Sequence, residues 1–238
     1  MKKVLVLSGA GISAESGIST FRESDGLWEE YDVKVVCNYD SMLTNPELTI
    51  DFYDKRRSEL ESKEPNYAHK VIASLKEKYK DDFIVMTQNI DNLFEKAGMK
   101  SEDVIHLHGY LPELRCQNCD AIFDVGYKNQ ETFHNGKCPE CSGALRPNIV
   151  FFGEAAPKYE LLNYHVQNCE VIVVIGTSGN VIEVNHMAKA TSLSILNNLE
   201  PSWAIDDTNF TKTIYKPATQ AIDEIKEEID FYFEEPIS

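Results

Sequence analysis

The sequence lacks any long hydrophobic run. Its apolar stretches have the length of buried strands and fall far short of the roughly 18 apolar residues that a membrane-spanning helix needs. The first segment, MKKVLVLSGAG, begins with a basic pair and a short apolar run, but no cleavage-like segment follows it. We therefore expect neither export nor a membrane anchor, and we place the protein in the cytoplasm.

Positive charge is also scarce. Lys and Arg number 23 against 39 Asp and Glu, which gives a formal net charge of −16. Because proteins that bind phosphate backbones usually present a basic face, this balance argues against a nucleic-acid partner. Internal repeats, low-complexity tracts and long flexible linkers are absent from the sequence, and its hydrophobic fraction of 42% is that of an ordinary folded chain. One main domain with a smaller insertion is the expected organisation.

Short apolar runs that end in small polar residues recur along the chain. They are Val4 to Leu7, Phe83 to Met86, and Val171 to Ile175. Such runs are typical of parallel strands covered on both faces. Helical spacing appears elsewhere, at Ala68, Ile72 and Leu75 and at Ala221, Ile222, Ile225 and Ile229. The alternation predicts an α/β fold with a doubly wound parallel, Rossmann-like sheet, in which ligands bind at the carboxyl ends of the strands.

Two stretches interrupt this alternation and are interpreted as insertions that form a smaller domain. Residues 31–65 are predicted to be a helical insertion, and residues 115–145 a zinc-ribbon module. The Rossmann-like domain then comprises residues 1–30, 66–114 and 146–238.

Four cysteines have the spacing of a zinc site. Cys116 and Cys119 form one CxxC pair, and Cys138 and Cys141 form a second pair eighteen residues later. Four thiolates close the coordination shell of Zn²⁺, so the metal would be structural rather than catalytic. Four reduced thiols or two disulfides are the alternative, which the neighbouring turn residues and a reducing compartment disfavour.

A glycine-rich turn follows the first predicted strand. Its pattern, Gly9-x-Gly11-x-x-Ala14, is typical of turns whose backbone amides approach a dinucleotide pyrophosphate. The usual companion, a second strand ending in an acidic residue about 20 positions on, is missing. A tight strand-to-helix turn without a ligand is therefore the alternative.

The combination and order of the motifs resemble the sirtuin (Sir2) family. Agreement across so many separated segments argues against chance, and it extends from about Lys3 to the C-terminal helix. The segments are Gly9 to Ile18, Thr20-Phe21-Arg22, Thr87 to Asp91, His108-Gly109, the paired cysteines, Gly176-Thr177-Ser178, Asn198-Leu199-Glu200-Pro201 and Pro217-Ala218.

The resemblance implies an NAD site and a catalytic group. By similarity, Asn89, Asp91 and His108 are catalytic, with His108 as a base that must be neutral near pH 7. His106, two residues earlier, offers an internal comparison, because only His108 directly precedes a glycine. The NAD-binding residues implied by the family are Gly9, Ala10, Gly11, Ser13, Ala14, Thr20, Phe21, Arg22, Trp28, Gln88, Asn89, Ile90, Asp91, His108, Gly176, Thr177, Ser178, Asn198, Leu199, Glu200 and Ala218.

The implied activity is NAD-dependent removal of acyl groups from protein lysines. In the family reaction, the acyl oxygen displaces nicotinamide from the ribose carbon to give an alkylimidate. His108 would then deprotonate a ribose hydroxyl, and water would release lysine and O-acyl-ADP-ribose. Consumption of NAD separates this activity from hydride transfer on the same fold. Transfer of ADP-ribose to protein, a non-enzymatic nucleotide sensor and a four-cysteine nucleic-acid ribbon are the alternatives.

A segment that resembles the family's peptide-binding strand follows the second cysteine pair. It consists of Val150, Phe151, Phe152, Gly153 and Glu154, and it would pair with substrate backbone as an added strand. A buried strand that meets no peptide is the alternative. The stretch Asn180-Val181-Ile182-Glu183 departs from the family pattern, so the details of the peptide clamp stay open.

Tyr53 and Arg56 predict the acyl preference. They share one face of a predicted helix, and a phenol and a guanidinium together can bind a carboxylate. The same Tyr-x-x-Arg arrangement resembles that of sirtuins acting on succinyl- and malonyl-lysine, although an Arg between Lys55 and Arg57 could simply be solvated. Cys37 stands where such relatives often have Ala and would narrow the acyl pocket. We predict a monomer that prefers succinyl and malonyl groups, retains some deacetylation, and binds acylated lysine but neither nucleic acid nor membrane.

Overall fold

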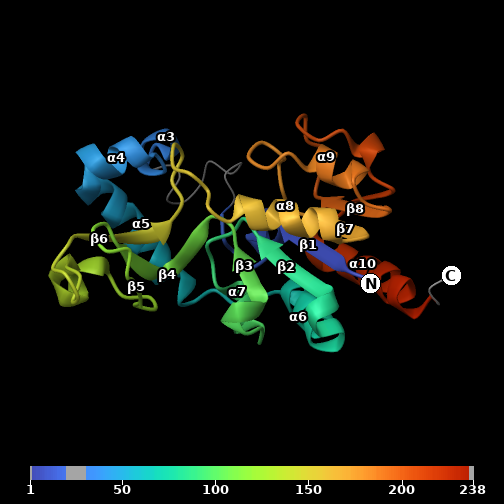
Figure 1. The fold of residues 1–238 in the computed structure, drawn as a ribbon, viewed down its shortest axis with the longest axis horizontal. Helices are drawn as coiled ribbons and strands as arrows, with labels where there is room; N and C mark the ends of the chain where they lie inside the picture. The colour runs from blue at the N-terminus through green and yellow to red at the C-terminus, as the bar shows by residue number, and fades with distance from the viewer. Residues whose placement is uncertain (1, 20–30, 236–238) are drawn as a thin grey trace.

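The computed structural model describes residues 2–19 and 31–235, which form two lobes side by side (Figure 1). The larger lobe is built on a six-stranded parallel sheet, and the smaller lobe combines a three-stranded antiparallel sheet with helices. The predicted fold class, a Rossmann-like sheet with a smaller second domain, is confirmed.

The large sheet has the strand order β3-β2-β1-β7-β8-β9. Strand β1 is central, with β2 on one side and β7 on the other, so the chain changes direction across the sheet at β1. Ligands bind at such switch points in open parallel sheets. Every residue of β1, β2 and β7 is buried, which explains their uninterrupted apolar sequences. In sheet order the strands are Val104–His106, Phe83–Thr87, Val4–Ser8, Val171–Ile175, Leu193–Asn198 and Lys212–Tyr215.

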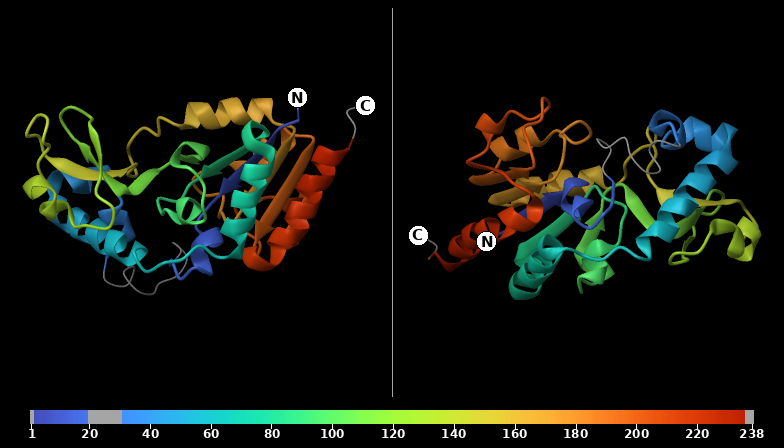
Figure 2. Two further views of the ribbon diagram at one scale, coloured as in Figure 1. Left: turned by 90° about the horizontal axis from the view of Figure 1, so that it is seen from below. Right: turned by 180° about the vertical axis from the view of Figure 1, so that it is seen from behind.

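Helices cover both faces of this sheet (Figure 2). Helices α6 (Tyr67–Tyr79) and α10 (Ala218–Glu234) bury their apolar residues in the core on one face, while α8 (Tyr159–Asn168) and α9 (Val184–Lys189) cover the other. The apolar positions whose spacing predicted α6 and α10 are buried. Short helices α1 and α7 span Gly11–Ala14 and Leu93–Lys96, and 3-10 turns span Lys80–Asp82, Ser101–Asp103, Gln130–Thr132, His134–Gly136 and Asp207–Asn209.

The smaller lobe has two apolar cores. One lies around Phe52 on helix α5 and includes residues from β4 and β6. The other lies inside the antiparallel sheet β5-β4-β6 and includes two cysteines. Strands β4 and β6 contain the predicted domain boundaries at 114/115 and 145/146, so these boundaries fall within paired strands. The elements of this lobe are α3 Val33–Val36, α4 Tyr39–Thr44, α5 Pro46–Leu60, β4 Gly109–Cys116, β5 Ile122–Asp124 and β6 Leu145–Ile149.

A fully buried arginine attaches helix α5 to the rest of the smaller lobe. The Nε of Arg57 donates to the carbonyl oxygen of Leu111 at 2.7 Å, and its Nη1 pairs with the carboxylate of Asp54. Asp54 also accepts from the backbone amide of Gln130. Buried charges require this kind of pairing, so Arg57 has a structural function in the lobe.

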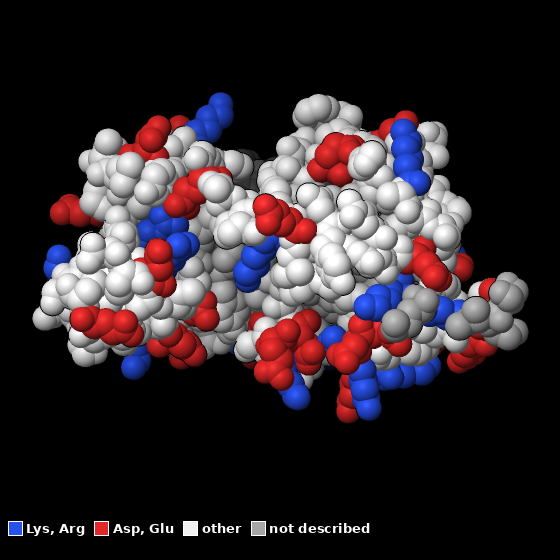
Figure 3. Space-filling model, viewed as in Figure 1, with Lys and Arg blue, Asp and Glu red and all other residues white. Residues whose placement is uncertain are grey.

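The surface reflects the acidic composition. Figure 3 shows acidic side chains over both lobes, interleaved with basic ones, and no continuous basic band crosses the described residues of that face. Among the helices of the described chain, none is long and apolar enough to cross a membrane.

Candidate active site

A cavity of about 820 Å³ lies at the carboxyl ends of β1, β2 and β7 and continues into the smaller lobe. Its volume is typical of small-molecule sites. Thr20, Phe21, Arg22 and Trp28 lie outside the described residues. Every other residue predicted to bind NAD or substrate lines this cavity: Gly9, Ala10, Gly11, Ser13, Ala14, Tyr53, Arg56, Gln88, Asn89, Ile90, Asp91, His108, Val150, Phe151, Phe152, Gly153, Glu154, Gly176, Thr177, Ser178, Asn198, Leu199, Glu200 and Ala218.

The glycines of the first turn allow two strand ends to meet. The amide of Gly9 donates to Ile175 and that of Gly11 donates to Gly176, both at 2.8 Å. A Cβ on Gly9 or Gly11 would lie 2.7 or 2.6 Å from Gly176, closer than side chains tolerate. The glycine pattern therefore has a structural reason of its own, and the same lack of side chains exposes backbone to the cavity.

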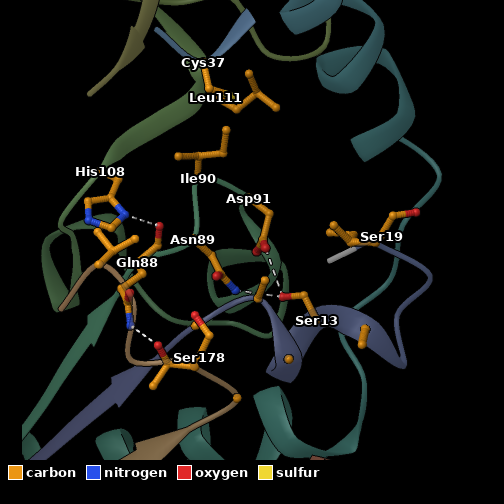
Figure 4. Close-up of a pocket in the computed structure, with 18 of the residues that line it drawn as sticks. Ser13, Ser19, Cys37, Gln88, Asn89, Ile90, Asp91, His108, Leu111 and Ser178 are labelled. Atoms are coloured by element: carbon orange, nitrogen blue, oxygen red, sulfur yellow. Dashed lines mark hydrogen bonds between the residues drawn. The ribbon is translucent and has the colours of Figure 1, made fainter. Parts of the chain in front are cut away.

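Polar side chains from the β1 and β2 loops form a network beside this turn (Figure 4). The hydroxyl of Ser13 donates to the carboxylate of Asp91 at 2.9 Å, and the side-chain amide of Asn89 donates to Ser13 at 3.1 Å. Gln88 donates to Thr177 at 3.0 Å and so links the β2 and β7 loops. Burial raises the pKa of Asp91. These contacts hold Asn89 and Asp91 in place at the cavity wall.

His108 has the geometry of a neutral base. Its Nδ1 lies 3.0 Å from the carbonyl oxygen of Gln88, which can only accept, so Nδ1 carries the hydrogen (Figure 4). Nε2 is then the acceptor, and the hydroxyl of Tyr159 donates to it at 2.8 Å. Burial lowers the pKa of His108, while the Gln88 carbonyl raises it, and the net shift is downward. The ring is therefore neutral near pH 7, as a general base requires.

His106 lies outside the cavity lining and makes different contacts. Its Nδ1 lies 2.9 Å from the carbonyl oxygen of Asn89, and its Nε2 lies 2.9 Å from the carboxylate of Glu95. The two histidines thus hold adjacent carbonyl groups of the β2 loop. Only the ring of His108 reaches the cavity.

Gly109 allows strand β4 to begin directly after His108. Its φ of +92° belongs to the left-handed region, and a Cβ there would lie 2.2 Å from the carbonyl oxygen of Asn148. Only glycine permits this approach of β4 to β6. The pair His108-Gly109 therefore reflects a backbone requirement next to the base.

Three consecutive basic residues on α5 have three different environments. Lys55 is exposed and pairs with Asp51 at 3.3 Å, and Arg57 is fully buried. Arg56, between them, is half-buried and lines the cavity beside Tyr53. Burial lowers the pKa of Arg56. A guanidinium and a phenol therefore border the end of the cavity that lies in the smaller lobe.

The predicted peptide segment is irregular rather than a strand. Strand β6 ends at Ile149, and only Phe152 forms a bridge, with Asn38. The amide of Phe152 donates to Cys37 at 2.8 Å, and its carbonyl accepts from Tyr39 at 3.0 Å. The backbone of Phe152 is thus already paired within the chain, which removes one residue from the edge that a peptide would meet.

Glu154 stabilises the turn that ends this segment. Its carboxylate accepts two hydrogen bonds from the guanidinium of Arg146, at 2.7 and 2.8 Å, and one from the amide of Phe151 at 2.9 Å. Bidentate pairs of this kind are strong and directional. The carboxylate of Glu154 therefore points to its own chain.

One polar side-chain atom in the cavity wall has no hydrogen-bond partner among the described residues, and a bound dinucleotide would supply one. The Nδ2 of Asn198 is buried in its wall and makes no hydrogen bond with the described residues. Such a donor costs free energy unless an acceptor reaches it, and a bound polar ligand would provide one. Tyr159 lines the same cavity, but no sequence motif marked it.

The four cysteines come together as their spacing predicted. Their Sγ atoms all lie within 4.8 Å of one another, with Cys116 and Cys141 at 3.5 Å and Cys119 and Cys138 at 3.7 Å. Tetrahedral Zn–S bonds of about 2.3 Å place sulfurs about 3.8 Å apart, so the group fits Zn²⁺. None of the four, all within the described residues, forms a disulfide.

Comparisons with known proteins agree with this architecture. A family model described as the Sir2 family matches residues 9–183. An NAD-dependent protein deacylase of Campylobacter jejuni is 46% identical over 236 residues, covering 99% of each chain, and one of Helicobacter hepaticus is 45% identical over 258 residues, covering 98% of this chain and 99% of that protein. Among solved structures, a Sir2 homolog–NAD complex has a TM-score of 0.82 at 32% identity, covering 97% of this chain and 90% of that one. Sir2Tm bound to a propionylated peptide has a TM-score of 0.76 at 28% identity, covering 96% and 93%. The chain therefore belongs to the Sir2 family, as the order of its motifs predicted.

Proposed function

We propose that this chain is an NAD-dependent protein deacylase that prefers succinyl- and malonyl-lysine, retains some deacetylation, and releases nicotinamide and O-acyl-ADP-ribose. The names of its relatives and the NAD complex of a structural neighbour support the reaction class. One observation carries the acyl preference. A single cavity contains the base His108 at one point and the pair Tyr53 and Arg56 at another.

The residues around His108 support its function as the base. Bound NAD supplies a ribose carbon from which nicotinamide can leave. The neutral Nε2 of His108 faces the cavity and can take the proton of a ribose hydroxyl, while Nδ1 stays bonded to Gln88. Asn89 and Asp91, fixed by Ser13, would orient the ribose and the carboxamide.

The smaller lobe would receive the acyl group. Arg56 supplies a positive charge in a half-buried position, where its electrostatic attraction for a carboxylate is stronger than in bulk water. Tyr53 adds a phenolic donor on the same side of α5. The acyl-lysine would enter past the segment from Val150 to Glu154, where the side chain of Phe152 is 51% exposed.

Several further assignments stay predictions. Thr20, Phe21, Arg22 and Trp28 are proposed to complete the NAD site. The cytoplasmic location, the monomeric state, and the lack of nucleic-acid and membrane partners likewise stay predictions.

The deciding experiment compares two substituted proteins on matched peptides. Purified protein is incubated with NAD and either an acetyl- or a succinyl-lysine peptide, and free lysine peptide and nicotinamide are followed by mass spectrometry. Arg56→Met should lower desuccinylation roughly ten- to a hundredfold and spare deacetylation, because it removes a charge-assisted contact. Lys55→Met removes the same charge one residue earlier, outside the cavity, and should change neither rate. Equal losses on both peptides would refute the function of Arg56, and nicotinamide release without loss of acyl-lysine would favour ADP-ribose transfer.

A further inference from the structure

The base of the proposed reaction has one usable lone pair, and it is occupied. A neutral imidazole has a single acceptor nitrogen. In His108 that atom is Nε2, because Nδ1 faces the carbonyl oxygen of Gln88. The hydroxyl of Tyr159 lies 2.8 Å from Nε2, within the distance of a good hydrogen bond.

Tyr159 is positioned to donate to Nε2 in the free protein and to be displaced from it by a ligand in the cavity. It is the first residue of α8, and its ring packs at the edge of the core beneath that helix, 5.9 Å from the ring of His108. Burial raises the pKa of Tyr159, so its hydroxyl keeps its proton and acts as a donor at neutral pH. The side chain is half-buried and lines the cavity, so a ligand that reaches Nε2 also meets Tyr159.

We propose that Tyr159 caps the base of the resting protein, and that a ribose hydroxyl of bound NAD must replace the phenol at Nε2 before His108 can act. This inference rests on the proposed function, since it concerns the base of the same reaction. Tyr159 is a positioning residue that acts through His108. Its hydrogen bond stabilises the free protein and is absent from the reacting complex, so it opposes binding of the ribose in the reactive position.

The hydrogen bond from Tyr159 should shift the pKa of His108 in a definite direction. Tyr159 can donate only to an unprotonated Nε2, so it favours the neutral ring and lowers the pKa of His108 in the free protein. Tyr159→Phe should therefore raise that pKa. In the described residues, Tyr159 is the titratable side chain that hydrogen-bonds to the ring, and no charged group contributes to the shift of His108. Because the phenol is displaced in the complex, the pKa of His108 there should not change.

Steady-state kinetics of Tyr159→Phe test the cap on a succinyl-lysine peptide with NAD. The acid limb of kcat/KM for NAD should move to higher pH by roughly half a unit to one unit, while the acid limb of kcat stays in place. Near pH 8, kcat/KM for NAD should rise roughly two- to tenfold through a lower KM. Tyr164→Phe is the matched control, since Tyr164 is on the same helix and 57% exposed, and it should change nothing.

Two results would overturn the cap. A fall in kcat of tenfold or more in Tyr159→Phe would show that the phenol acts in the reacting complex, as a proton relay or as part of its architecture. An unchanged acid limb of kcat/KM would show that the contact does not influence His108.

A titration without turnover separates this inference from the proposed function. The imidazole signal of His108, identified in NMR spectra by its loss in His108→Gln, is followed against pH in the ligand-free protein. The signal should titrate at higher pH in Tyr159→Phe than in the unsubstituted chain, and equal titration would refute the cap. If the unsubstituted chain removes no acyl group, the proposed function fails while the titration still decides the cap.

Discussion

The hydroxyl of Tyr53 lies 3.3 Å from the Sγ of Cys37 and donates to it. A thiol is a weak acceptor, whereas a carboxylate forms shorter and stronger hydrogen bonds. A succinyl or malonyl carboxylate beside Arg56 would therefore compete with the thiol for the phenol and win. If the proposed preference for succinyl and malonyl groups holds, Cys37 should reduce this preference without abolishing it.

Replacing Cys37 by Ala should increase the preference for acidic acyl groups. The phenol of Tyr53 would no longer have a partner to give up, and the pocket would widen. We expect the ratio of desuccinylation to deacetylation, measured as kcat/KM on matched peptides, to rise roughly two- to tenfold. Cys169→Ala, at the other buried cysteine outside the zinc group, should leave the ratio unchanged. A constant or lower ratio in Cys37→Ala would contradict this account.

Much of the fold follows from the sequence because its signals are local. Strands β1, β2 and β7 are buried on both faces, so each appears as an uninterrupted apolar run. The family motifs that line the cavity stand at the ends of these strands or at the ends of β3, β8 and β9 in the same sheet, so one cavity contains residues from all of them. The spacing of the cysteines likewise predicted which four thiols lie together.

Other features depend on contacts that no local pattern contains. Successive helical residues point about 100° apart, so Lys55, Arg56 and Arg57 must differ in environment, but only packing against the smaller lobe decides which one faces the cavity. Glu154 turns back to Arg146 across a distance in sequence that has no periodic signal. Tyr159 is a single tyrosine at a helix start, and its contact with the base arises only from the arrangement of α8 over the sheet.

Stability should depend on pH through His69, which is fully buried. Burial lowers its pKa to about 3, below the value of about 6.5 for an unfolded chain. As pH falls from 6.5 towards 3, the unfolded state therefore takes up a proton that the folded state refuses, and the folded state loses stability. Between pH 7 and 5.5 this one group should lower the free energy of unfolding by about 1 kcal/mol.

His69→Gln should remove that contribution. Urea denaturation of the zinc-loaded protein at both pH values gives the change for each variant separately, so any general destabilisation by the substitution cancels. The variant should lose about 1 kcal/mol less than the unsubstituted chain between the two pH values. His186→Gln, at an exposed histidine, should behave like the unsubstituted chain. Identical pH dependence in all three proteins would show that His69 has the same pKa in the folded state as in the unfolded chain.

The cysteine group should bind one zinc ion and hold the antiparallel sheet together. Cys116 and Cys138 are buried in the core of that sheet, so the metal and the apolar core stabilise each other. Cys138→Ser should lose its zinc by elemental analysis and lower the free energy of unfolding by about 4 kcal/mol or more. Cys169→Ser should keep the ion. Full zinc content in Cys138→Ser would show that this thiol is not a ligand.

Lys96 connects the two lobes at the end of the helix that carries Tyr53 and Arg56. Its ammonium donates to the carbonyl oxygens of Leu60 at 2.7 Å, Glu61 at 3.1 Å and Lys63 at 2.7 Å. Those three acceptors use all three of its hydrogens. The last carbonyls of a helix lack partners within it, and the helix dipole favours a cation there. Lys96, on α7 of the larger lobe, therefore ties the C-terminal end of α5 and the turn after it to that lobe.

Lys96→Met keeps the apolar stem and removes the donors. Loss of the three hydrogen bonds should lower the free energy of unfolding by about 1–3 kcal/mol, measured by urea denaturation. Because α5 would then be held less firmly against the larger lobe, KM for a succinyl-lysine peptide should rise more than KM for an acetyl-lysine peptide. Lys100→Met is the control, since the side chain of Lys100 is 75% exposed and pairs only loosely with Glu102 at 3.7 Å. A stable Lys96→Met variant with unchanged KM values would show that Arg57 and its partners suffice to position Tyr53 and Arg56.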